Sequence, residues 1–379
     1  MATLKRRKTA EDKENCPANV SVRAVKGEKL QKSVEETYQK KSQLEHILLR
    51  PDSYVGSTEK QSAEHWVFHD ASGRMEKKTL EYVPALYKIF DEILVNAADN
   101  LIRDPTQDTI RVEVKRKEGS ISVWNNGAGL PVQMHREHHC YVPELVFGQL
   151  LTSDNYDDAE KKVVGGRNGY GAKLTNIFST KFILETADSR SGKKYKQVWE
   201  KNMTVCHKPS ITANKSEDFT QVTFYPDFSR FGMRALEEDI VALMRRRAFD
   251  VAASTRQRCK VILDGKLLEV SCFQDYVDLF VAPEQFRISQ VVNDRWEVAL
   301  GLTDGSGFQQ VSFVNSINTS RGGTHVSYIT DQVVSAVLEK IGKQKNGGAC
   351  FAVPRVPRMV GGGEGGTGEC LQKESDFQT

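Results

Sequence analysis

The sequence predicts an α+β fold, in which helices and mostly antiparallel strands are mixed without the strand–helix–strand rhythm of a parallel sheet. Two local patterns carry this prediction. Apolar and charged residues alternate in several stretches, as in half-buried strands, and apolar residues recur at helical spacing in others. At roughly 100–200 residues per domain, 379 residues are enough for two or three domains with a sizeable core.

The composition excludes several classes of protein. With 53 basic and 50 acidic side chains, a net charge of +3 and 39% apolar residues, the chain is neither collagen-like nor wholly disordered. No apolar run approaches the ~18 residues of a membrane-spanning helix, so we expect no membrane partner. Seven scattered cysteines without a C-x-x-C pair favour a reducing compartment over a disulfide framework or a zinc ribbon.

The N-terminal segment, residues 1–30, is rich in charged residues and poor in large apolar ones, and we expect it to be disordered. Its run Lys5-Arg6-Arg7-Lys8 has two interpretations, a nuclear import signal or a solvated basic tail. It lacks an apolar stretch, so it does not resemble a secretory signal.

Helices and a hairpin are predicted next along the chain. We expect one helix at residues 43–49, ending before Pro51, and a second at residues 83–98 with a clear apolar stripe. Residues 108–124 alternate on either side of Glu118-Gly119, which predicts a β-hairpin. Further strands are predicted at residues 181–186, 195–199, 221–225 and 259–263, and a helix at residues 236–253.

A second unit is expected to begin near Lys260. Residues 295–302 and 309–314 are predicted to pair as strands about the turn at residues 304–307, with a helix at residues 327–341. The glycine run at residues 361–366 is expected to be incompatible with the interior of a strand or helix. Residues 347–379 are therefore predicted to be a flexible tail.

One face of the second helix carries polar groups suited to chemistry. At about 100° per residue, Glu92, Asn96, Asp99 and Asn100 fall within one arc opposite the apolar stripe, and we expect no Lys or Arg on that arc. A glutamate there can orient a water as a base, and an asparagine carbonyl can face a hard cation. The alternative is an ordinary solvated helix face.

Two glycine-rich stretches follow. Asn125 ends a strand ahead of Gly127 and Gly129, where an amide could read a purine edge and the glycines could let backbone approach a ligand; the alternative is a plain turn. In residues 165–174, four glycines in seven positions flank basic and amide groups, which predicts a phosphate cradle leading into a helix. It is not a Walker A loop, because Ala172 stands where that motif needs lysine.

A cluster of possible metal ligands lies at His135-Arg136-Glu137-His138-His139-Cys140. No second cluster accompanies it, and a structural zinc site needs four placed ligands. A solvated loop is therefore the favoured interpretation.

In this order, the polar helix and the two glycine-rich stretches resemble the Bergerat-fold ATPases. Further stretches are similar to the N-terminal ATPase region of eukaryotic DNA topoisomerase II over about residues 36–346; they are residues 38–41, 43–57, 87–100, 147–153, 312–316 and 321–325. The resemblance implies a Bergerat-type ATPase sandwich at residues 31–259. An incomplete, ribosomal-S5-like transducer domain is implied at residues 260–346.

The resemblance also implies roles for single residues. Glu92 corresponds to the general base, and Asn96 to the Mg²⁺ ligand. Asn125 corresponds to the adenine contact, and Thr220 to a threonine behind the base. The implied ATP-binding set is Asn96, Asn100, Asn125, Ser153, Asp154, Asn155, Gly166, Arg167, Asn168, Gly169, Tyr170, Gly171, Ala172, Lys173 and Thr220. Lys343, Gln344 and Lys345 lie where the family contacts DNA.

The implied function is the ATP-binding, dimer-gate region of a nuclear, homodimeric type II topoisomerase. With ATP and Mg²⁺ as cofactors, such an enzyme passes one DNA duplex through a transient double-strand break, and its cleavage domains are absent from this chain. Asp154 stands where the family has serine, and the match fails after about Asn346, so weak ATP hydrolysis is expected. The alternative is a non-catalytic, nucleotide-binding fragment that interferes with full-length topoisomerase.

Overall fold

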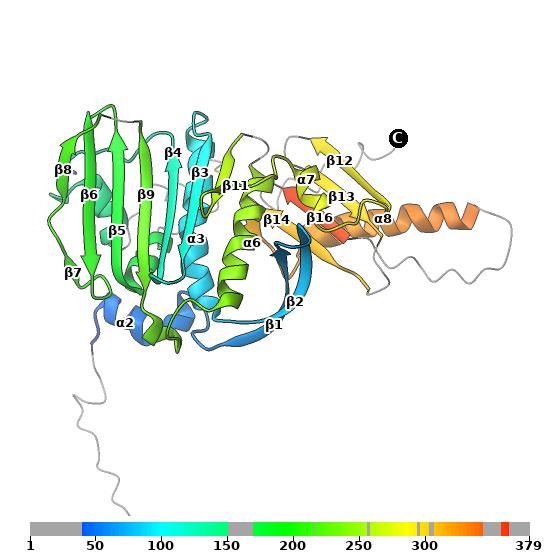
Figure 1. Ribbon diagram of the computed structural model, residues 1–379, viewed down its shortest axis with the longest axis horizontal. Coiled ribbons are helices and arrows are strands. Elements are labelled where there is room, and N and C mark those ends of the chain that lie inside the picture. Colours follow the sequence, from blue (N-terminus) through cyan, green and yellow to red (C-terminus); the bar gives the residue numbers. More distant parts are fainter. Residues whose placement is uncertain are drawn as a thin grey trace, which may run out of the picture. The chain divides into compact units, whose positions relative to one another are not determined.

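The computed structural model describes residues 40–150, 170–215, 217–255, 258–293, 296–302, 307–343 and 358–363. The chain divides into two units, Met1–Ser42 and Gln43–Thr379, and every helix and strand described below belongs to the second. Figure 1 shows these elements in chain order by colour. None of the described helices combines the length and the apolar character that crossing a bilayer requires.

The first part of the second unit contains most of the described elements. They are α2 (Gln43–Leu49), η1 (Pro51–Ser53), β1 (Gln61–His69), β2 (Arg74–Tyr82), α3 (Pro84–Arg103), β3 (Thr109–Lys115), β4 (Ser120–Asn126), α4 (Val142–Gly148), α5 (Gly171–Ile177), β5 (Ser179–Asp188), β6 (Lys193–Glu200), β7 (Val205–Cys206), β8 (Ser210–Ala213), β9 (Phe219–Pro226), η2 (Phe228–Phe231), α6 (Glu238–Ser254), β10 (Lys260–Leu263) and β11 (Lys266–Leu267).

The strands β3 to β11 form a sheet of nine described strands, here called the large sheet. Its order is β11-β10-β3-β4-β9-β5-β6-β7, and β8 also pairs with β6. Neighbours are antiparallel in the described part except for the parallel pair β10 and β3. Apolar residues alternate along β3, and Ile110 and Val112 are buried in the core. The pleat therefore fixes which face of the sheet the helices cover.

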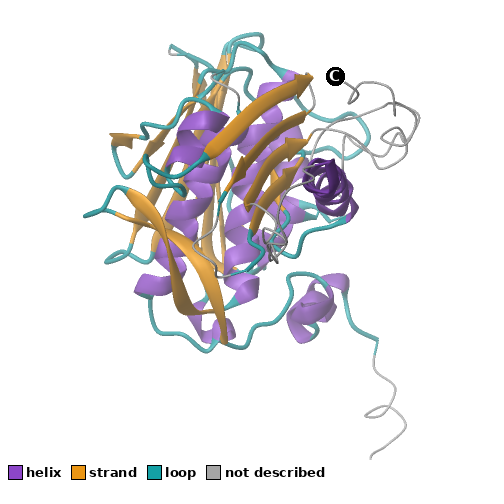
Figure 2. Ribbon diagram, turned by 90° about the vertical axis from the view of Figure 1, so that its right-hand side faces the viewer, coloured by secondary structure: helices purple, strands orange, loops and turns teal. Residues whose placement is uncertain are grey.

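The helices α3 and α6 cover one face of the large sheet, and the hairpin β1–β2 packs on α6 from the other side (Figure 2). Pro84 occupies the first turn of α3, where its missing N–H costs nothing, and the apolar stripe from Leu86 to Leu101 is buried. This packing buries the apolar face of α3 and leaves its polar face at the edge of the core.

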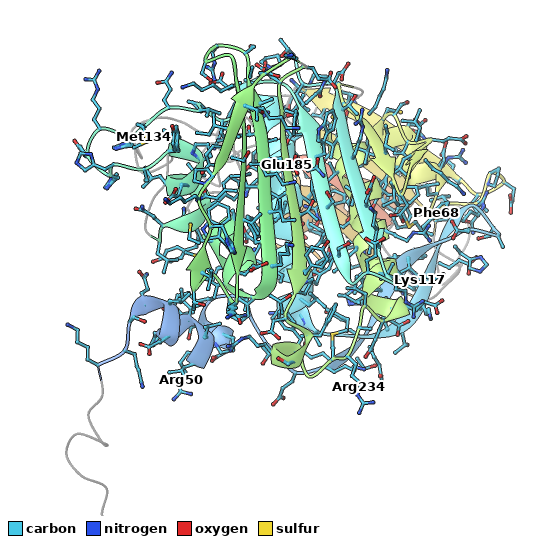
Figure 3. All side chains as sticks on the ribbon, turned by 60° about the vertical axis from the view of Figure 1, so that its left-hand side comes forward. Arg50, Phe68, Lys117, Met134, Glu185 and Arg234 are labelled. Carbon is cyan, nitrogen blue, oxygen red and sulfur yellow. The ribbon has the colours of Figure 1, made fainter. Side chains whose placement is uncertain are left out.

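The opposite face of the large sheet carries polar side chains, among them Glu185 (Figure 3). Glu185 pairs with Lys196 at 2.8 Å, and the Arg111 guanidinium lies 3.9 Å from the ring centre of Trp124. An ion pair and a cation–π contact of this kind are typical of a sheet face that is exposed to solvent.

The second sheet, here called the small sheet, has five described strands in the order β12-β13-β16-β14-β15. Its elements and the neighbouring helices are α7 (Phe273–Asp278), β12 (Arg287–Asn293), β13 (Trp296–Gly301), β14 (Gln310–Val314), β15 (Ile317–Asn318), α8 (Thr324–Lys343) and β16 (Arg358–Gly363). Val326 and Ile329 of α8 pack on apolar residues of β13.

Several predicted elements are confirmed. The helix at residues 43–49 and the hairpin of β3 and β4 are present, and α3 continues five residues beyond the predicted end, to Arg103. The helix predicted at residues 236–253 is α6, and that at residues 327–341 is α8. The helix predicted to follow the glycine-rich stretch is α5, whereas the hairpin β1–β2 and the short helix α4 were not predicted.

Two predictions about the small sheet are wrong. The stretches at residues 295–302 and 309–314 do form β13 and β14, but these strands do not pair with each other, because β16 lies between them. Gly361, Gly362 and Gly363 are part of β16, although this run was expected to exclude a strand. β16 pairs with β13 on one side and with β14 on the other, and the backbone hydrogen bonds of both ladders hold the glycines in the strand although they have no side chains to pack.

The strand that opens the second predicted domain belongs to the large sheet. β10 begins at Lys260 and pairs with β3, with Lys260 opposite Thr109. The sheet change therefore comes later than Lys260, at β12. The division of the whole chain into domains at residues 30, 259 and 346 otherwise stays a prediction.

Candidate nucleotide site

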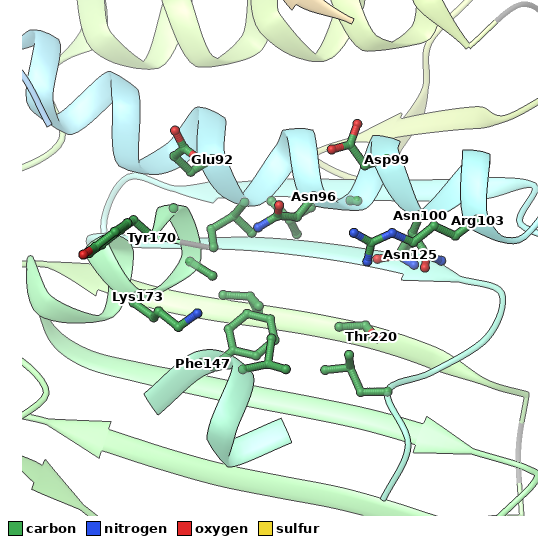
Figure 4. A pocket seen from close by; sticks show the side chains of 18 of the residues that line it. Glu92, Asn96, Asp99, Asn100, Arg103, Asn125, Phe147, Tyr170, Lys173 and Thr220 are labelled. Carbon is green, nitrogen blue, oxygen red and sulfur yellow. The ribbon is translucent and has the colours of Figure 1, made fainter. Parts of the chain in front are cut away.

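A cavity of about 1170 Å³ opens between α3, the strands β4 and β9, and the helices α4 and α5. Figure 4 shows polar side chains entering it from these elements. The cavity brings together nine of the predicted site residues, namely Glu92, Asn96, Asn100, Asn125, Tyr170, Gly171, Ala172, Lys173 and Thr220. Asp99, Arg103 and Arg190 also line it.

All but one of the other predicted site residues have no described position. Ser153, Asp154, Asn155, Gly166, Arg167, Asn168 and Gly169 lie outside the described residues, as do Gln344 and Lys345. Lys343 is the last residue of α8. The roles of these residues remain predictions.

Glu92 sits at the junction of α3 and α5. Its Oε1 pairs with the Lys88 ammonium one turn earlier, and its Oε2 lies against Gly171, where a Cβ atom would come within 1.9 Å. Gly171 is therefore needed for a close approach, and the approaching group is the Glu92 carboxylate itself. The expectation that no Lys or Arg shares this face is wrong, because Lys88 lies on it four residues before Glu92.

Asn96 lies one turn beyond Glu92 on α3 and is exposed to the cavity. Lys173 approaches from α5 on the opposite side (Figure 4). Oxygen donors from Glu92 and Asn96 suit a hard cation such as Mg²⁺, and a lysine facing them suits an anion. The donor set of the cavity thus fits a magnesium-bound phosphate.

Gln107 organises the far end of the cavity, and the sequence analysis missed it. Its Oε1 accepts from Nδ2 of Asn100 at 2.7 Å and from Nδ2 of Asn125 at 3.2 Å, while its Nε2 donates to the Ala97 carbonyl at 2.8 Å. Gln107 is 1% exposed. Because both asparagines donate through Nδ2, each turns its Oδ1 acceptor away from Gln107.

The glycines after Asn125 serve the protein's own packing. A Cβ on Gly127, whose φ is +87°, would lie 2.8 Å from Asp104 Oδ2, and one on Gly129 would lie 1.8 Å from the Ala187 carbonyl oxygen. The hydrogen bond that the Ala128 amide donates to Asp104, at 2.5 Å, lowers the pKa of this carboxyl, with a further contribution from Thr106. For Gly127 and Gly129, the structure favours the tight turn.

The Thr220 hydroxyl on β9 lines the floor of the cavity and lies against a buried threonine of β5. Thr220 Oγ1 lies 3.2 Å from Thr186 Oγ1, and Thr186 also accepts from the Leu130 amide at 3.0 Å. At the opposite end, the Tyr170 hydroxyl accepts from Gln43 Nε2 at 2.9 Å. Gln43 and Tyr170 are thus in contact although 127 residues separate them in the chain.

The histidine cluster lies on the exposed loop between β4 and α4. Ligand atoms of His135, Glu137 and His138 come within 4.8 Å of one another. However, the backbone amides of Glu137 and His138 face Nδ1 of His135 at 3.3 and 3.4 Å. Two backbone amides thus already occupy the Nδ1 acceptor of His135, which favours an ordinary loop over a metal site.

Comparison with known proteins identifies relatives of both sheets. A family model described as histidine kinase-, DNA gyrase B- and HSP90-like ATPase matches residues 83–230, and one described as DNA gyrase B matches residues 272–349. DNA topoisomerase 2 of Pisum sativum is 55% identical over 322 residues, which cover 83% of this chain and 22% of the relative. DNA topoisomerase 2 of Saccharomyces cerevisiae is 50% identical over 332 residues, which cover 83% of this chain and 23% of the relative. The chain thus spans less than a quarter of the length of these relatives.

Solved structures agree with these matches. The ATPase region of Saccharomyces cerevisiae topoisomerase II superposes with a TM-score of 0.81 and 49% identity, covering 88% of this chain and 87% of that one. The ATPase and transducer domains of Balamuthia mandrillaris topoisomerase II superpose with a TM-score of 0.81 and 45% identity, covering 88% of this chain and 86% of that one. The 43K ATPase domain of Thermus thermophilus gyrase B, at 20% identity and a TM-score of 0.54, shares the fold. The predicted α+β, Bergerat-type fold is confirmed.

Proposed function

The chain belongs to the eukaryotic type II DNA topoisomerases, within which it corresponds to the ATPase region, and we propose that it binds ATP with Mg²⁺ in the cavity beneath α3. The observation that carries this proposal is one cavity that is lined by Glu92 and Asn96 of α3 together with Lys173 of α5. Two helices that are far apart in the sequence, α3 and α5, supply these groups.

The residues that line the cavity have proposed roles that their positions support. Asn96 would hold Mg²⁺ through its carbonyl oxygen, and Lys173 would meet the phosphates. Asn125 and Thr220 line the far end, where they would contact the adenine, with Asn100 beside them. Bound Mg²⁺ would neutralise charge on the phosphates. For Tyr170, Gly171 and Ala172, and for the residues at 153–155 and 166–169, we propose the nucleotide contacts that the family resemblance implies.

Glu92 is proposed as the base that orients the attacking water. A general base must lie within hydrogen-bond reach of the water it activates. The carboxylate of Glu92 lines the cavity, and Gly171 allows it to sit directly against the start of α5. Lys88 holds the other carboxylate oxygen and so restricts the rotation of the group.

Beyond nucleotide binding, we propose the gate function of the whole family for this chain. Two copies would close as a homodimer on ATP binding and capture a DNA duplex, in the nucleus, with Lys343, Gln344 and Lys345 contacting the DNA. The similarity to proteins named DNA topoisomerase 2 supports this proposal. In the alternative, an interfering fragment, nucleotide would bind without turnover. An ATPase rate per protomer that rises with protein concentration would contradict that alternative.

The direct test is calorimetry of nucleotide binding with and without Mg²⁺. Asn96→Ala removes the proposed metal ligand, so metal-dependent binding should be lost, and Asn293→Ala in the small sheet should bind as the parent does. An unchanged affinity for Mg·ATP in Asn96→Ala would contradict the assignment.

A further inference from the structure

A buried arginine of α6 joins the helix that carries Glu92 to the small sheet. Arg247 is 0% exposed. Its Nε donates to Asp91 Oδ1 on α3 at 2.6 Å, and its Nη2 donates to the Ser316 carbonyl at 2.7 Å. Asp91 is the residue directly before Glu92. One guanidinium therefore contacts both the neighbour of the proposed base and a turn of the other sheet.

The turn that receives Arg247 has a defined shape. Asn315 and Ser316 have φ angles of 50° and 61°, and they connect β14 to β15, where Val314 pairs with Ile317. Two consecutive residues with positive φ between paired strands are the geometry of a tight type I′ hairpin turn. Such a turn holds its carbonyl groups in fixed directions, so the Ser316 carbonyl moves only when β14 and β15 move with it.

A second contact reinforces the same connection. Asp250, one turn after Arg247 on α6 and 1% exposed, accepts from the Tyr276 hydroxyl at 2.5 Å and from Asn318 Nδ2 at 3.2 Å. Arg246 Nε lies 3.5 Å from the same carboxylate. The strand β15 is thus attached to α6 through Ser316 and through Asn318.

The shape of the Arg247 guanidinium fixes the relative positions of its two partners. It is planar and its N–H groups have fixed relative directions, so Asp91 and Ser316 can both be bonded only in one relative placement. Among the described residues, Nη1 of Arg247 is buried without a hydrogen-bond partner. A buried ion pair left partly unsatisfied is poorly suited to stability alone, which favours a role in holding geometry.

This geometry fixes the rotation of α3 about its own axis. Asp91 and Glu92 are successive residues, about 100° apart around the helix axis. With Asp91 held by Arg247, Glu92 faces Gly171 and the cavity. If α3 rotated so that Asp91 left Arg247, Glu92 would also leave its place.

We propose that Arg247 is a positioning residue that couples the Asn315–Ser316 turn of the small sheet to the orientation of Glu92. A displacement of the small sheet then changes the placement of the base, and nucleotide in the cavity changes the order of the turn. This inference rests on the proposed function, because it needs nucleotide to bind beside Glu92.

The first test separates turnover from binding. Arg247→Met and Asp91→Asn should each lower the turnover number about tenfold while the affinity for a non-hydrolysable Mg·ATP analogue changes less than about threefold. Arg247→Lys should not restore turnover, since one ammonium cannot reproduce the fork. Arg245→Met is the matched control, because Arg245 is the neighbouring residue on α6 and pairs with the exposed Asp70. Equal losses of binding and turnover, or an equal loss in the control, would overturn the proposal.

The second test needs no turnover. Hydrogen exchange is followed in the presence and absence of the same analogue, and the parent chain should show slower exchange both in α3 and in residues 312–318. In Asp91→Asn, which keeps the side-chain shape and so preserves folding best, only α3 should be protected. Protection of residues 312–318 in that variant would overturn the coupling. If the analogue does not bind the parent chain, the proposed function is overturned and this inference with it. If the analogue binds but exchange in residues 312–318 of the parent does not slow, the inference alone is overturned.

Discussion

The large and the small sheet hold their strands in different ways. In the large sheet, alternating apolar side chains such as Ile110, Val123 and Phe224 fix each register against the helices. In the small sheet, the strand between β13 and β14 contains three successive glycines, and its register depends on backbone pairing. Side-chain pattern specifies register strongly, whereas a glycine-rich strand specifies it weakly.

This difference indicates where function can be placed. A reaction needs groups held in a precise geometry, and the large sheet supports the helices α3 and α5 whose residues Glu92, Asn96 and Lys173 line the cavity. Because a glycine-rich strand specifies register weakly, the small sheet is the better candidate for motion, which would reach α3 through Arg247. Four predictions test this division of roles, from the largest expected effect to the smallest.

The largest effect should come from the base itself. Glu92→Gln keeps the size of the side chain and removes its basicity, so turnover should fall by about 10²–10⁴-fold while Mg·ATP still binds. Steady-state hydrolysis and calorimetry on the same preparation measure the two quantities. Glu113→Gln, on the exposed face of β3, is the control. Parallel losses of binding and turnover would show that Glu92 serves another purpose.

Much of this site could be predicted from the sequence, since periodicity alone placed Glu92, Asn96 and Asn100 on one face of a helix. Gln107 could not be predicted, because a buried amide in a loop has no periodic signature and its partners come from α3 and β4. Lys88 was missed because it lies at the edge of the polar arc, one turn before Glu92, and only the folded side chain shows that its ammonium reaches the carboxylate. The strand at Arg358–Gly363 was missed because its stability depends on two distant strands and not on its own residues.

Matched core substitutions should separate the two sheets. Phe224 in β9 is 0% exposed and Phe313 in β14 is 2% exposed, so each change to alanine should lower the free energy of unfolding by about 3–5 kcal/mol. Only Phe224→Ala should also weaken nucleotide binding, because β9 carries Thr220 into the cavity. Denaturant titration and calorimetry on both variants test this. A larger loss of affinity in Phe313→Ala would reverse the assignment of roles.

A glycine at the site should matter more than a glycine in open space. Gly171→Ala places a methyl group on Glu92 Oε2, so the carboxylate must move, and turnover should fall by about tenfold or more. Gly342→Ala in α8 meets nothing within 4 Å and should stabilise the helix by up to about 1 kcal/mol without changing turnover. Hydrolysis rates and melting temperatures of the two variants make the comparison. Unaltered turnover in Gly171→Ala would show that Glu92 is not placed by this contact.

The smallest effect should be a pH dependence that belongs to the small sheet. His325 Nε2 lies 3.1 Å from Thr319 Oγ1 and 3.2 Å from Ser312 Oγ, and burial lowers the pKa of this imidazole. The unfolded chain therefore takes up the proton more readily than the folded one, so its stability contribution is present above the ordinary histidine pKa of about 6.5 and is lost as the pH falls below it. His325→Gln should reduce the slope of the free energy of unfolding between about pH 7 and pH 5.5, above the range in which carboxylates titrate. The remaining slope includes a contribution from His65 in β1, because burial, with a smaller effect of Arg246, also lowers the pKa of that imidazole. The exposed His138→Gln should leave the slope as it is. A wild-type stability that rises as the pH falls through this window would contradict the prediction, as would an unchanged slope in His325→Gln.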